Sequence, residues 1–131
     1  MALPNGAGGY QVGDGNIGEV LLGTQAAPAA YTAAAAPLLV SDVTNGLITY
    51  NAAGPNNLQL PTVANLELDA SSAKVNSAFE FGVIALGAGT GTITTNTGWT
   101  LVGSMAVATT VSARFLARKT GAGTWTLYRI A

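Results

Sequence analysis

The chain has 131 residues, of which 8% are charged, and its formal net charge is −1. This length suits one domain with a single core. His and Cys are both absent, so the chain lacks the usual general base at neutral pH, the commonest metal ligand, and any thiolate or disulfide. These absences predict that the protein is not an enzyme and holds no cofactor or metal ion. Because a surface with so few charges repels its own copies weakly, the composition favours association.

The few charged residues are unevenly distributed along the chain. Residues 1–73 contain five acidic side chains and no basic one, whereas residues 74–131 contain five basic side chains and one acidic residue, Glu80. This asymmetry predicts either complementary contacts between neighbouring molecules or one fold in which the two halves interleave. Neither nucleic acid nor membrane is an expected partner. The basic patch is small, and the apolar stretch at residues 26–40 is mostly Ala, broken by prolines and shorter than the roughly 20 residues of a membrane span.

Residues 1–37 are rich in Gly, Ala and Pro, and we interpret them as an extended N-terminal arm. Residues 13–18 match the pattern G-x-G-x-x-G, but the strand and helix that a dinucleotide site requires do not flank them, so we interpret them as a turn. The arm has too little apolar surface to offset its ordering entropy, so we expect it to be mobile in the free protein or bound to another surface. An edge strand of its own domain at residues 20–22 is the alternative. The expected partner-binding residues are its larger apolar side chains: Leu3, Tyr10, Val12, Ile17, Val20, Leu21 and Leu22.

Residues 38–131 alternate short apolar runs with Gly, Thr and Asn turns, a pattern typical of an all-β domain. We expect a single antiparallel β-sandwich or barrel, jelly-roll-like, with at most one short helix. That helix is predicted at residues 63–73, capped by Thr62. Residues 38–40 and 47–50 are predicted to form a hairpin across Asn45-Gly46. Further strands are predicted at residues 58–60, 79–86, 92–95, 99–102, 105–109, 112–119 and 124–130.

A short internal echo relates two parts of this domain. The run Gly-Ala-Gly-Thr occurs at residues 87–90 and again at residues 121–124, and the same offset of 34 aligns Phe81 with Phe115. The echo predicts two similar hairpins, each anchored by one inward-facing Phe. Two copies are too few for a repeat protein.

Four basic residues gather near the C-terminus, with Trp125 and Tyr128 close to them in the sequence. Among these, Arg114 and Arg118 are predicted to face a partner, where acidic residues of a neighbour's arm such as Asp14 and Glu19 would meet them. A solvated strand face without a partner is the alternative.

Both ends of the chain resemble small virion proteins of tailed bacteriophages, in particular head decoration (cement) proteins and related β-rich fibre modules. The resemblance lies in Met-Ala-Leu-Pro-Asn-Gly-Ala-Gly-Gly-Tyr-Gln-Val-Gly-Asp-Gly-Asn at the start, in residues 79–86, and in Ser-Ala-Arg-Phe-Leu-Ala-Arg-Lys-Thr-Gly-Ala-Gly-Thr-Trp-Thr-Leu-Tyr at residues 112–128. It implies an all-β module, made in the host cytoplasm, that binds the major capsid protein on the capsid surface and associates with itself as a homotrimer. No functional residue carries over from the family.

A fibre or spike module that binds a host surface glycan is the alternative function. Such a module needs an exposed aromatic platform, for which Trp99, Trp125 and Tyr128 are the candidates.

Overall fold

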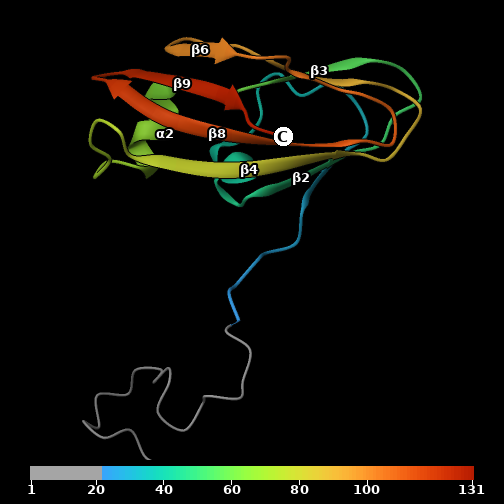
Figure 1. The fold of residues 1–131 in the computed structure, drawn as a ribbon, viewed down its shortest axis with the longest axis horizontal. Helices are drawn as coiled ribbons and strands as arrows, with labels where there is room; N and C mark the ends of the chain where they lie inside the picture. The colour runs from blue at the N-terminus through green and yellow to red at the C-terminus, as the bar shows by residue number, and fades with distance from the viewer. Residues whose placement is uncertain (1–21) are drawn as a thin grey trace, which may run out of the picture.

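A computed structural model describes residues 22–131, and Figure 1 shows its course. Within these residues the chain forms two sheets and two short helices, α1 (Val40–Thr44) and α2 (Val63–Asp69). The β-rich fold expected from the sequence is therefore confirmed. The strands are β1 (Ala29–Tyr31), β2 (Leu47–Tyr50), β3 (Asn56–Gln59), β4 (Ala78–Ala85), β5 (Gly91–Thr94), β6 (Trp99–Val102), β7 (Ala106–Val107), β8 (Ser112–Gly121) and β9 (Thr124–Arg129).

The larger sheet has the strand order β1-β2-β4-β8-β9-β6, and the smaller has the order β3-β5-β7. Within residues 22–131, the pairs β4–β8, β8–β9 and β5–β7 are antiparallel, whereas β1–β2, β2–β4, β6–β9 and β3–β5 are parallel. The prediction of a purely antiparallel fold is therefore wrong. Parallel neighbours need a crossover connection, and the chain supplies one through α1 between β1 and β2, and another through β3 and α2 between β2 and β4.

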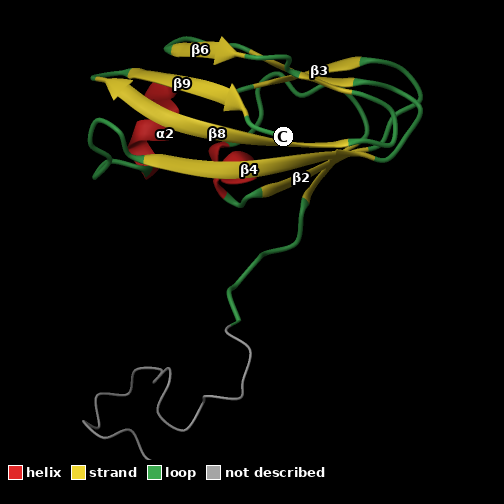
Figure 2. Ribbon diagram, viewed as in Figure 1, coloured by secondary structure: helices red, strands yellow, loops and turns green. Residues whose placement is uncertain are grey.

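One hydrophobic core joins both sheets and both helices. Alternate residues of β4 and β8 point into it, and they meet buried side chains from the small sheet, from α1 and from α2. The helices lie on one side of the large sheet only, behind β4 and β8 in the view of Figure 2. The other face of that sheet is not covered by any element of residues 22–131.

Phe81 and Phe115 lie opposite each other on β4 and β8, and both are fully buried. Their rings stack with centroids 5.4 Å apart. The prediction that both face inward is confirmed, but only the second echoed segment forms a hairpin, β8–β9. After the first Gly-Ala-Gly-Thr run the chain leaves β4 and enters the small sheet as β5. Gly89 of that run packs on Gly54, where an added Cβ would lie 2.0 Å from the carbonyl oxygen of Gly54.

The helices differ in part from the prediction. Thr62 caps α2 as expected, because its hydroxyl accepts a hydrogen bond from the Asn65 N–H at 3.2 Å. The helix ends at Asp69 rather than at residue 73, just before Ser71-Ser72. The expected strand at residues 38–40 and its hairpin do not form. Val40 instead begins α1, and Gly46, at a φ of 97°, lets the chain turn out of that helix into β2. The expectation of at most one helix is therefore wrong.

The chain joins the folded domain earlier than residue 38. Residues 29–31 form β1, the edge strand beside β2, and Ala35 is buried and bridges to Leu58 of β3. Within the expected arm, residues 29–31 are thus sheet and Ala35 is core, while residues 22–28 are exposed and residues 22–24 lead away from the domain (Figure 1). Neither described helix is long and apolar enough to cross a membrane.

Candidate interaction surface

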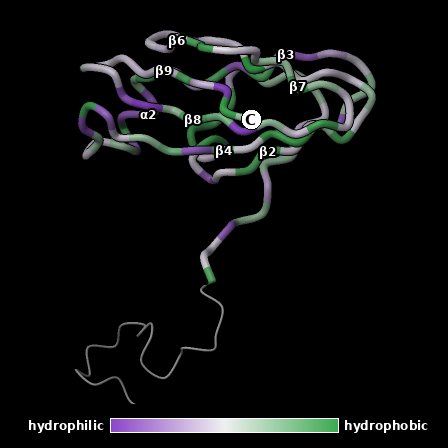
Figure 3. The backbone as a smooth tube through the Cα atoms, viewed as in Figure 1, coloured by the Kyte–Doolittle hydropathy of each residue, from purple (hydrophilic) through white to green (hydrophobic). Residues whose placement is uncertain are grey.

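The uncovered side of the large sheet is the broadest candidate surface, and we call it the open face. Its residues alternate with the core residues of the same strands, so their side chains project away from the helices. Several of its apolar side chains are half-buried, and Figure 3 shows hydrophobic and hydrophilic residues interspersed along these strands. The open face comprises Leu47, Thr49, Glu80, Ile84, Thr100, Val102, Arg114, Leu116, Arg118 and Tyr128.

Arg114 lies on β8 and reaches diagonally across to β4. Its guanidinium donates a hydrogen bond to Glu80 Oε1 at 2.8 Å. Both side chains are largely exposed, and an ion pair of this kind contributes at most about 1 kcal/mol. Arg114 therefore remains open to a competing partner.

Arg118 lies on the same face of β8 and is held more firmly. Its guanidinium donates to the Tyr128 hydroxyl at 2.7 Å and to Asn76 Oδ1 at 2.8 Å. The guanidinium carbon also lies 5.6 Å from the centre of the Tyr128 ring, within the range of a cation–π contact. The structure thus brings the two predicted residues Arg114 and Arg118 onto one surface. Both are engaged with side chains of their own chain.

Lys119 follows Arg118 in β8, but its side chain contacts α2 and stabilises the fold. Its ammonium group donates to Glu67 Oε2 of α2 at 2.5 Å, and the indole N–H of Trp125 donates to the same oxygen at 3.2 Å. The hydrogen bond from Lys119, followed by the one from Trp125, lowers the pKa of Glu67. This cluster fastens α2 to β8 and β9, and it joins the acidic half of the sequence to the basic half.

Of the apolar arm residues predicted to bind a partner, the structure describes only Leu22. Leu3, Tyr10, Val12, Ile17, Val20 and Leu21 lie outside residues 22–131, and Leu22 is 88% exposed. Behind it, the Gln25 amide donates to the Asn45 carbonyl oxygen at 2.7 Å, and the Asn45 amide donates to the Ala27 carbonyl oxygen at 2.9 Å. The segment before β1 is therefore tied to the C-terminal end of α1.

A second contact fixes β1 to α1. The Tyr31 hydroxyl donates to the buried Asp42 carboxylate, which also accepts the Leu39 N–H at 2.9 Å. Burial, together with this hydrogen bond, raises the pKa of Tyr31 to about 12. The base of the arm is thus anchored, while its preceding residues are exposed.

The aromatic side chains proposed as a glycan platform do not form one. Trp99 and Trp125 are buried and pack on each other with ring centroids 6.1 Å apart. The Trp99 indole donates to the Pro61 carbonyl oxygen at 2.7 Å, and Tyr128 is occupied by Arg118. These three rings therefore offer no open stacking surface for a sugar.

On the open face, sequence reasoning missed Leu116, and Tyr128 as the partner of Arg118. On the helix side of the large sheet it missed the exposed pair Leu39 and Leu68. Alternation along β8 is a signal that finds Leu116, since it shares the parity of Arg114 and Arg118. Leu68 lies within α2 and Leu39 directly precedes α1, a helix that is not predicted from the sequence. No protein-family model, curated protein or solved structure matches this chain.

Proposed function

We propose that the protein is a virion structural protein, a capsid decoration module that binds the assembled shell of a tailed bacteriophage and stabilises it. The open face is the observation that carries this proposal. It is broad and uncovered within the described residues, its charged side chains are Arg114, Arg118 and Glu80, and it mixes these with half-buried aliphatic side chains and Tyr128. Tyr and Arg are enriched in protein interfaces, whereas Lys and Glu are depleted. The resemblance of both chain ends to decoration proteins supports the assignment to a virus particle.

The proposed mechanism is mechanical. A protein that binds only the assembled shell shifts the assembly equilibrium by its binding free energy, with no chemical step. Its partners are the major capsid protein and further copies of itself, arranged as a homotrimer on the capsid surface. The proposal includes a sandwich-like packing of the small sheet over the large one, so that the open face is presented on a firm support. Because Trp99 and Trp125 are buried, no observation favours the glycan-binding alternative.

Binding to purified shells tests this function. Shells of the virus that encodes the chain, assembled without it, are mixed with wild-type protein, with Leu116→Asp and with Val111→Asp, and co-sedimentation is measured. Leu116 is central on the open face, whereas Val111 is an exposed apolar residue in the turn before β8. We expect Leu116→Asp to weaken binding by about tenfold or more, because it introduces a charge into the apolar part of an interface. We expect Val111→Asp to bind like the wild type.

Circular dichroism and urea unfolding of each variant serve as folding controls. Absence of wild-type binding to the shells would refute the proposed function. Equal binding of the three folded proteins would show that the open face is not part of the interface with the shell.

A further inference from the structure

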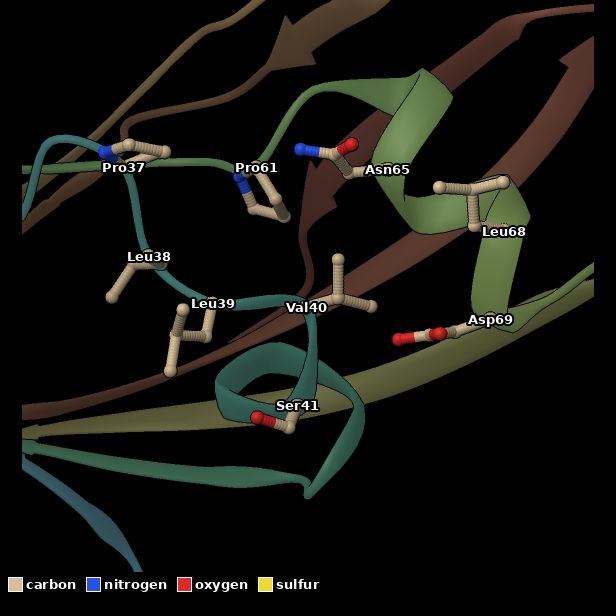
Figure 4. Close-up of a pocket in the computed structure, with 9 residues that line it drawn as sticks. All are labelled: Pro37, Leu38, Leu39, Val40, Ser41, Pro61, Asn65, Leu68 and Asp69. Atoms are coloured by element: carbon tan, nitrogen blue, oxygen red, sulfur yellow. The ribbon is translucent and has the colours of Figure 1, made fainter.

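A groove of about 390 Å³ lies between the start of α1 and the outer side of α2 (Figure 4). Its floor and walls are mostly apolar and include Leu39, Val40, Pro61 and Leu68. Among residues 22–131, the one ionisable side chain that lines it is Asp69, at the C-terminal end of α2. The groove is distinct from the open face, because the helices that form it lie on the other side of the large sheet (Figure 2).

The apolar side chains around this groove are unusually exposed. Leu68 is 77% exposed and Leu39 is 65% exposed. Together with Leu22 of the arm, they are the three most exposed large apolar side chains of residues 22–131. Single exposed apolar residues are ordinary, but a pair flanking an apolar groove is typical of a docking site.

The chain carries a segment of matching chemistry. Leu22 ends the uncharged aliphatic run Val20-Leu21-Leu22, and 21 residues precede Leu22 in the sequence. The run is aliphatic and most of the groove lining is apolar, so burial of one against the other gains hydrophobic free energy, and the run itself brings no charge that must be desolvated. The side chains of Asn65 and Asp69 offer hydrogen-bond acceptors to the main chain of an extended segment.

The described end of the arm leads away from its own domain. Gln25 and Ala27 are bonded to Asn45, just past the C-terminal end of α1, whereas Leu39 and Val40 of the groove lie at the N-terminal end of that helix. From there, residues 22–24 extend away from the domain (Figure 1). Residues 22–24 therefore lead away from the groove of their own domain, which favours docking of the preceding run in another copy.

We propose that residues 20–22 of one copy dock in the groove between α1 and α2 of a neighbouring copy. The contact is heterologous, since the arm of each copy enters the groove of the next, and such contacts close into a ring when the rotation between copies allows it. The proposal deepens, and in that respect rests on, the self-association included in the proposed function. It also places this copy-to-copy contact in an apolar groove rather than between acidic arm residues and Arg114 or Arg118. The association is therefore expected to persist at high salt, where exposed charge pairs are screened.

Cysteine cross-linking tests the contact in the full chain, without any virus particle. The wild-type chain has no Cys, so each introduced thiol is unique. The Leu22→Cys protein is labelled with a heavy nitrogen isotope and combined with unlabelled Leu68→Cys protein. After mild oxidation, mass spectrometry measures the mixed disulfides, which join one labelled chain to one unlabelled chain. Leu86→Cys replaces Leu68→Cys as the control, because Leu86 is also exposed but lies beyond the end of β4, outside the groove.

We expect about tenfold more mixed disulfide with Leu68→Cys than with Leu86→Cys, since a disulfide needs Cα atoms within about 7 Å. Equal yields with the two partners would overturn the proposal. In the double variant Leu22→Cys/Leu68→Cys, a disulfide formed mainly within one chain at a concentration where the wild type is associated would also overturn it. A negative result leaves binding of the open face to the shell to be judged by the co-sedimentation experiment alone.

Discussion

At the scale of single residues, the stack of Phe81 on Phe115 is the centre of the core. Truncating Phe115 to Ala removes a fully buried ring whose neighbours can collapse only partly. We expect a loss of about 3–5 kcal/mol in the free energy of unfolding, measured by urea denaturation. The adjacent Leu116→Ala, on the open face, should cost about 1 kcal/mol or less. Similar losses for the two variants would contradict the assignment of β8 faces.

The hydrogen bond from Tyr31 to Asp42 predicts a dependence of stability on alkaline pH. Because the folded state raises the pKa of Tyr31 from 10.0 to about 12, the neutral phenol favours folding. Its contribution is fully present below pH 10 and is lost as the pH rises towards about 12. We expect the unfolding free energy of the wild type to fall more steeply over this interval than that of Tyr31→Phe. If the unfolding free energies of the two proteins fall in parallel with pH, the Tyr31 hydroxyl does not make this stabilising hydrogen bond to Asp42.

Some residue roles were predictable from the sequence and others were not. Thr62 was assigned correctly as a cap because capping depends on local order alone: a short hydroxyl side chain directly before the helix. Trp99 and Trp125 were candidates for an exposed platform, and both are buried. Which face of a strand is covered depends on elements distant in the sequence, so no local pattern distinguishes a core Trp from a surface one.

At the scale of elements, the long strands were the most predictable. Residues of β4, β8 and β9 alternate or run apolar over enough positions to define a strand. Helix α1 was missed because five residues are far below the length at which helical periodicity can be recognised, and Leu38-Leu39-Val40 resembles a strand. Parallel pairing was also missed, since strand direction is decided by crossover connections and leaves no mark within the strand.

The arm belongs to the same scale, and its first 23 residues can be removed as a unit. The described residues that this deletion touches, Leu22 and Gly23, are exposed, and the anchors at Gln25 and Tyr31 remain. We expect the unfolding free energy to change by about 0.5 kcal/mol or less when it is measured at a protein concentration where both chains are monomeric. Self-association should be lost in the same protein. If the chain that lacks residues 1–23 fails to fold, the arm is part of the core.

At the scale of the whole molecule, low charge and an uncovered sheet face predict an assembly of identical copies. Three copies are what the resemblance to decoration proteins implies, and in the proposed cyclic trimer the arm of each copy would occupy the groove of the next. Light scattering of the full chain should give three times the mass of one 13.1 kDa chain. The mass should decrease to that of a monomer in Leu68→Asp, whose new charge would lie at the groove. A monomeric wild type at high concentration would contradict the proposed trimer.

The central claim is that the protein forms part of a virus particle. Electron microscopy of purified particles, at a resolution that distinguishes strands, tests it most directly, with particles from a virus lacking this gene as the control. We predict density for the two-sheet domain on the outside of the wild-type capsid, with the open face against the shell, and its absence from the control particles. Identical capsid surfaces in the two samples would contradict the account.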